Sequence, residues 1–115
     1  MTFELIDLEE LGEKALRDFH ESLVQSDEGK RTDFQQVVST LVGKVEFAYG
    51  VAAKLAHREQ TIEGTAAIWA KMVAICDGIA AEVKRLEDHH PQYKASYDRI
   101  LDYRNEAEKR RALHA

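Results

Sequence analysis

The sequence predicts an all-α protein, arranged as an antiparallel four-helix bundle in one domain of residues 1–115. Two observations carry this prediction. Stepping by four and three from Phe34 to Val83 meets apolar residues at fourteen of fifteen positions, which is the pattern of helices packed along one line. The composition, with 32% charged residues and one proline, is typical of long helices. We call these positions the seam: Phe34, Val38, Leu41, Val45, Ala48, Ala52, Leu55, Glu59, Ile62, Ala66, Trp69, Val73, Cys76, Ala80 and Val83.

The first helix is expected to start at Asp7 and to stop before Gly29. Asp7 and Glu10 have the spacing of a capping box, and Ile6 and Leu11 have that of a hydrophobic staple. Glycine is a common residue just after the end of a helix. An apolar stripe lies between these signals: Leu8, Leu11, Ala15, Leu16, Phe19 and Leu23.

The second helix is expected to open at a capping box formed by Thr32 and Gln35. Residues 57–65 then decide the architecture. The cations at positions 57 and 58, followed by Gly64 and Thr65, suit a helix end and a new start, and they favour the four-helix bundle. The seam nevertheless continues from Leu55 to Ile62, which favours the alternative of one long helix over about residues 33–89 in an elongated hairpin or coiled-coil dimer.

The segment from 66 to 86 is hydrophobic around most of its circumference, so we expect it to be buried on more than one side. It is either a central helix of the bundle or part of a subunit interface. The interface residues predicted on this segment are Ile68, Trp69, Met72, Ile75, Ile79 and Leu86.

Four glycines share the heptad position farthest from the seam: Gly43, Gly50, Gly64 and Gly78. Small residues at such positions permit the close approach of another backbone. After them, Pro91 suits the first turn of a last helix. The apolar residues expected to face the core from that helix are Tyr93, Tyr97, Ile100, Leu101 and Ala107.

Few residues suggest chemistry. Glu87 and His90 form a Glu-x-x-His pair, but di-iron bundles need two such pairs, so we expect no metal or other cofactor. Cys76 lies on the seam without a neighbouring cation in the sequence, where burial of a small apolar residue is the ordinary role.

Arg85 and His90 have an Arg-x4-His spacing, and in this the segment resembles the HEPN-type ribonucleases, which are small all-helical proteins. The resemblance covers six residues, Arg85-Leu-Glu-Asp-His-His90. It implies that Arg85 neutralises the scissile phosphate and that His90 transfers a proton. Glu87 and Asp88, which lie between them, would repel RNA.

The net charge is −5, with ten acids against four bases in residues 1–33 and four acids against six bases in residues 92–115. A negative net charge disfavours nucleic acid and anionic lipid as partners. No signal peptide or membrane span is apparent, so a cytoplasmic location is expected.

We therefore expect a non-enzymatic protein-interaction or oligomerisation module, a homodimer or the partner of another protein, with no small-molecule substrate. The alternatives are the HEPN-like ribonuclease and an elongated membrane-associated helical scaffold.

Overall fold

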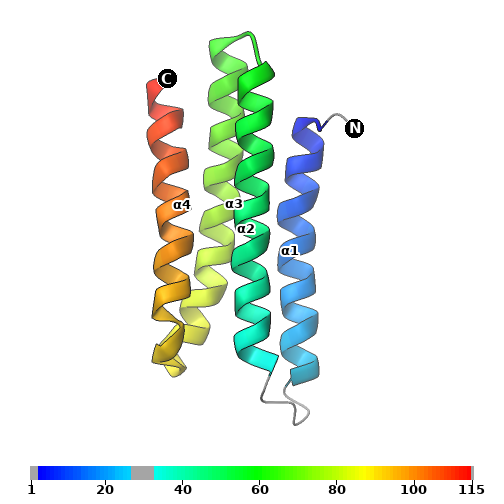
Figure 1. Ribbon diagram of the computed structural model, residues 1–115, viewed down its shortest axis with the longest axis vertical. Coiled ribbons are helices and arrows are strands. Elements are labelled where there is room, and N and C mark those ends of the chain that lie inside the picture. The colour runs from blue at the N-terminus through cyan, green and yellow to red at the C-terminus, as the bar shows by residue number, and fades with distance from the viewer. Residues whose placement is uncertain (1–2, 27–32, 115) are drawn as a thin grey trace.

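The computed structural model describes residues 3–26 and 33–114. Within these ranges the chain forms only helices, which run alternately down and up (Figure 1). The predicted stop at Gly29 and the predicted cap at Thr32 lie outside the described residues. The all-α four-helix bundle is confirmed. Its elements are α1 (Leu5–Ser26), α2 (Asp33–Arg58), α3 (Ile62–His89), a short 3₁₀ turn η1 (Pro91–Tyr93) and α4 (Lys94–Leu113).

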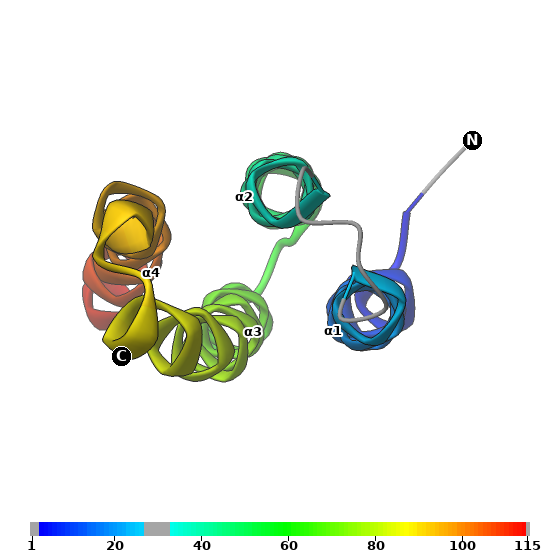
Figure 2. The ribbon, with the colours of Figure 1, turned by 90° about the horizontal axis from the view of Figure 1, so that it is seen from below.

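The four helices form a flattened bundle rather than a square one. Viewed along the helices, α1 and α4 lie at opposite edges, with α2 and α3 between them (Figure 2). The molecule measures 50 × 28 × 15 Å along its principal axes. α2 and α3 each pack against all three other helices, and α4 packs most extensively against α3. The expectation that the 66–86 segment is a central helix is therefore confirmed.

The core follows the predicted seam on both central helices. Cys76, Val45, Ala52 and Val83 are fully buried, and Trp69 is 2% exposed. Seam residues are buried together because a residue every three or four positions falls on one helix face. The other buried seam residues are Val38, Leu41, Ala48, Leu55, Val73 and Ala80.

α2 and α3 are separated by a three-residue break at Glu59, Gln60 and Thr61, so the long helix over 33–89 is wrong. Glu59 Oε1 accepts hydrogen bonds from the backbone N–H groups of Gln60 and Thr61, both at 3.1 Å, and from the Thr61 hydroxyl at 3.0 Å. Thr61 Oγ1 in turn accepts from the Gly64 N–H at 2.9 Å and caps α3. Ile62 is 65% exposed, so the seam crosses the break only by coincidence of spacing.

The start of α1 differs from the prediction. The helix begins at Leu5 rather than after Asp7, and Asp7 Oδ2 accepts a hydrogen bond from the backbone N–H of Glu4 at 2.7 Å. Asp7 therefore serves as the acid that reaches back to the cap, as in the third position of a capping box. Ile6 is 56% exposed, and the predicted hydrophobic staple is wrong.

The apolar faces of the outer helices are as predicted. Leu8, Ala15 and Phe19 of α1 are buried, and Leu11, Leu16 and Leu23 pack against the core. At the other edge Pro91 opens η1 and α4 follows. There, Tyr93, Ile100 and Ala107 are buried, and Tyr97 and Leu101 are half-buried.

Candidate functional site

The six residues predicted as an interface do not form an exposed surface in the single chain. Four of them, Ile68, Trp69, Met72 and Ile79, are buried in the chain's own core. Ile75 and Leu86 are half-buried and pack against that core. A subunit interface made by this set stays a prediction, but only Ile75 and Leu86 are accessible to a partner of the folded chain.

Trp69 anchors an aromatic cluster that joins three helices. Its ring centroid lies 5.4 Å from that of Tyr49 on α2, and the Tyr49 centroid lies 5.3 Å from that of Tyr103 on α4. The guanidinium of Arg110 lies 5.3 Å from the Trp69 ring, and its Nε donates to the Tyr49 hydroxyl at 2.9 Å. These contacts combine ring packing with a cation–π interaction, and they hold α4 against α2 and α3.

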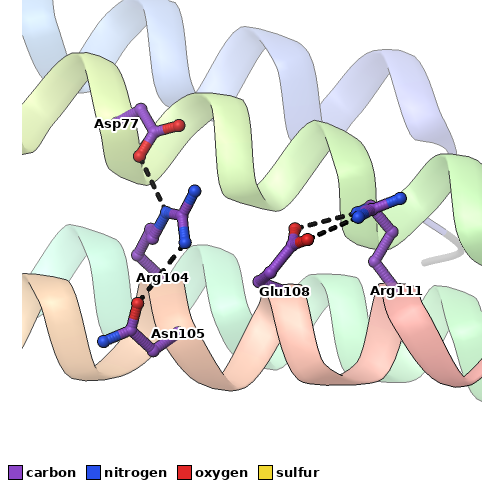
Figure 3. A network of polar contacts seen from close by, with 5 residues as sticks. All are labelled: Asp77, Arg104, Asn105, Glu108 and Arg111. Carbon is purple, nitrogen blue, oxygen red and sulfur yellow. Dashed lines mark hydrogen bonds and ion pairs between the residues drawn. The ribbon is translucent and has the colours of Figure 1, made fainter.

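A polar network lies along the boundary of α3 and α4 (Figure 3). Arg104 of α4 donates from Nε to Asp77 of α3 at 3.0 Å and also bonds Asn105. Two turns further along α4, Arg111 Nε donates to Glu108 at 2.8 Å. The Arg111 hydrogen bond lowers the pKa of Glu108 from its usual value. Glu108 is therefore held ionised and paired with a cation, so it is poorly suited to exchange protons as a general acid or base.

The thiol of Cys76 is also unsuited to catalysis. The side chain is fully buried in the core. Burial raises the pKa of the thiol to about 12, with a further contribution from the negative charge of Asp77. Because the thiolate is the nucleophile and the metal ligand, Cys76 is an apolar packing residue at neutral pH.

Arg85 and His90 occupy the last turns of α3 and its C-cap, but they engage different neighbours. Arg85 is exposed and its guanidinium lies 3.5 Å from Glu82. The ring of His90 packs edge-on against Tyr93, with centroids 6.1 Å apart. Glu87, which shares the Glu-x-x-His spacing with His90, pairs with Lys84 at 2.8 Å. Arg85 thus contacts its own helix and His90 contacts η1, and the HEPN-like ribonuclease stays an alternative prediction.

Within residues 3–26 and 33–114, no cluster of three or more His, Cys, Asp or Glu side chains has the geometry to hold a metal ion. In the same part of the chain, no helix is long and apolar enough to cross a membrane.

The accessible feature that stands out is the outward side of α2. We call it the α2 outer face. Of its residues, Phe47 is 55% exposed, and a Cβ added at Gly43 or Gly50 would meet nothing within 4 Å. The heptad pattern of glycines indicated this face, but no sequence signal marked Phe47 as exposed. The α2 outer face consists of Gln36, Thr40, Gly43, Phe47, Gly50, Lys54 and His57, all of them exposed.

A hollow of about 310 Å³ lies beside Gly43, between α1 and α2. Leu11 and Ala15 of α1 line it together with Thr40, Gly43 and Phe47 of α2. The ion pair between Lys44 and Asp18, at 3.0 Å, also borders it. The Lys44 hydrogen bond lowers the pKa of Asp18 from its usual value. The hollow is thus mainly apolar. Of the three charged residues that line it, Lys44 and Asp18 form this ion pair, and Lys14 is the third.

Comparison with known proteins finds no matching protein family, no similar curated protein and no similar solved structure. The fold defines the class of the protein, an all-helical bundle, and among the described residues the α2 outer face is largely uncharged.

Proposed function

We propose that this protein is a non-enzymatic association module that forms a homodimer through the α2 outer face. The observation that carries the proposal is the composition of this face. In a chain with 32% charged residues, its outward positions from Gln36 to Gly50 bear no charge, and Phe47 is exposed among them. Interface centres are depleted in charge and enriched in aromatic residues, and the central part of this face has both properties.

The charges that flank the α2 outer face support the same reading. Lys44 pairs with Asp18, and Glu46 accepts from Arg99 Nε at 2.8 Å. A partner covering this face therefore leaves Lys44 and Glu46 with their counterions, and an unpaired buried charge is the costly outcome at an interface. Two further observations support a non-enzymatic role. Asp77, Glu87 and Glu108 are engaged in ion pairs, and Cys76 is buried.

The test is the mass in solution measured by light scattering from low to high micromolar protein, with small-angle scattering at the upper end. We expect a shift from the monomer mass of 13.1 kDa to twice that value as concentration rises. Small-angle scattering should then give a particle thicker than the 15 Å short dimension of one copy, because the second copy adds a layer. A monomer mass at every concentration contradicts the proposal.

A further inference from the structure

We infer that two copies pair antiparallel along α2 about a twofold axis near Val45, with Phe47 of each copy seated in the hollow beside Gly43 of the other. This inference rests on the proposed function and specifies its interface. Phe47 is the projecting group and the hollow is the receiving site, and both belong to the same helix face, four residues apart. In a twofold interface each copy must present both halves of the contact, and this face does so.

The size and lining of the hollow suit a phenyl ring. A dry cavity of about 150 Å³ suffices to bind benzene, and the hollow beside Gly43 measures about 310 Å³. Leu11 and Ala15 supply apolar contacts on the α1 side. On its own copy, the Phe47 ring makes an edge contact with Phe3, with centroids 6.3 Å apart, and still remains 55% exposed.

The glycines of the α2 outer face have no explanation within one copy. Glycine in the middle of a helix is less stable than alanine, and at Gly43 and Gly50 a methyl group would meet no neighbouring atom. The presence of glycine at both positions is explained if a second backbone lies against the face. With the axis near Val45, Phe47 faces Gly43 of the second copy, and Gly50 faces its Thr40. In these two pairs a glycine stands opposite the larger residue.

Charge complementarity at the ends of the contact favours a second copy as the occupant. The C-terminal end of the α2 outer face is basic, with exposed Lys54 and His57. Antiparallel pairing brings Lys54 opposite Gln36 of the second copy, towards the C-terminal half of its α1. There Glu21 is exposed, two turns after the hollow-lining Lys14 and hence on the same side of α1. The Lys44–Asp18 pair fixes the position of α1 along α2. Because of the twofold symmetry, the contact between Lys54 of one copy and Glu21 of the other occurs twice.

Two substitutions test the seating of Phe47. Phe47→Ala removes the projecting ring, and Gly43→Leu fills the receiving hollow while replacing a poor helix former with a good one. Each should raise the dimer dissociation constant roughly 30-fold or more, as loss of a central aromatic anchor does, with the helical circular dichroism unchanged. Ile62→Ala is the control, because Ile62 is another exposed large apolar residue, 65% exposed, and lies on another helix. We expect its dissociation constant to stay within twofold of the parent.

A cross-linking measurement tests the register independently. In a Thr40→Cys/Gly50→Cys chain, mild oxidation should join two copies covalently. The thiol at position 40 of one copy faces the thiol at position 50 of the other across the axis. The same treatment of a Lys54→Cys chain should leave single chains, since its two thiols are separated by about 27 Å along the helices. Cys76 does not interfere, being fully buried with a thiol pKa of about 12.

The outcomes separate the two proposals. If the substitutions weaken the dimer but the 40/50 chain does not cross-link, this pairing is overturned and dimerisation through the α2 outer face stands. If a dimer forms that neither substitution weakens, the α2 outer face is not the interface and both proposals are overturned. A monomer mass for the parent chain at every concentration overturns both proposals and leaves a different protein as the only partner that the α2 outer face could bind.

Discussion

At the scale of single residues, Trp69 is the side chain whose truncation should destabilise the fold most. It is 2% exposed, contacts Tyr49, and is covered on one side by the guanidinium of Arg110. Its seam position predicted burial, because a large apolar residue on a sustained heptad line faces the core. Its partners were not predictable, since they lie 20 residues before it and 41 residues after it in the chain.

Trp69→Ala should lower the free energy of unfolding by about 3–5 kcal/mol, because truncation of a buried aromatic removes its packing and leaves a cavity. Urea unfolding followed by circular dichroism measures the change. Ala70→Ser is the adjacent control, since Ala70 is exposed and surface substitutions cost about 0.5 kcal/mol or less. A loss below about 1 kcal/mol for Trp69→Ala would place the ring outside the core and contradict the described packing.

At the scale of elements, the sequence predicts each helix well and the junctions less well. The stripe of Leu8, Ala15 and Phe19 is visible because helical periodicity is a local property. The position of the α2–α3 break could be predicted to within a few residues, but its chemistry could not. Glu59 occupies a seam position yet turns its carboxylate to the backbone of the next two residues, and heptad spacing carries no information on that choice.

The candidate site was the least predictable part for a related reason. The glycine pattern indicated one face of α2, but the exposure of Phe47 depends on how four helices share the available surface. α2 is covered on three sides by α1, α3 and α4, and the side left open is set by the flattened arrangement. That arrangement is a property of the assembled bundle, which no single helix pattern encodes.

The Glu59 cap predicts a pH dependence for the α2–α3 junction. The hydrogen bond from the Thr61 backbone, with the Thr61 hydroxyl next, lowers the pKa of Glu59 below its usual value of 4.5. A carboxyl whose pKa is lower in the folded state binds its proton more weakly there than in the unfolded chain. Its contribution to stability is therefore full above pH 4.5 and is lost as the pH falls through the lowered folded value.

Glu59→Gln should accordingly be less stable than the parent at pH 7, and the difference should shrink as the pH falls below 4.5. Urea midpoints at several pH values from 7 to 3 measure this, and Glu63→Gln, which removes another carboxylate close by in the first turn of α3, controls for general charge effects. A Glu59→Gln difference that stays constant across that range would show that the charge of Glu59 does not support the turn.

At the scale of the whole molecule, the flattened bundle makes the two edge helices unequal. α4 packs along α3 and is further held by the Asp77–Arg104 ion pair and the Trp69 cluster. α1 packs less extensively, against α2 and α3, and a glycine of α1 lies directly against α3. A Cβ at Gly12 would lie 2.7 Å from Ile75 Cγ1, and two other side-chain atoms of Ile75 would lie at 3.2 Å.

α1 should therefore open before the rest of the bundle, because regions with fewer buried contacts unfold locally at lower free energy. Native-state hydrogen exchange should show faster exchange of α1 amides than of α3 amides. Gly12→Ala should widen this gap, since the added methyl group forces Ile75 or the whole of α1 to shift. Gly78→Ala is the matched control on the same boundary, where the new Cβ would meet Leu16 at an ordinary 3.7 Å and α3 gains a better helix former. Exchange of α1 amides only at the rate of global unfolding, in the parent and in Gly12→Ala alike, would show that the four helices open as one unit despite the flattened arrangement.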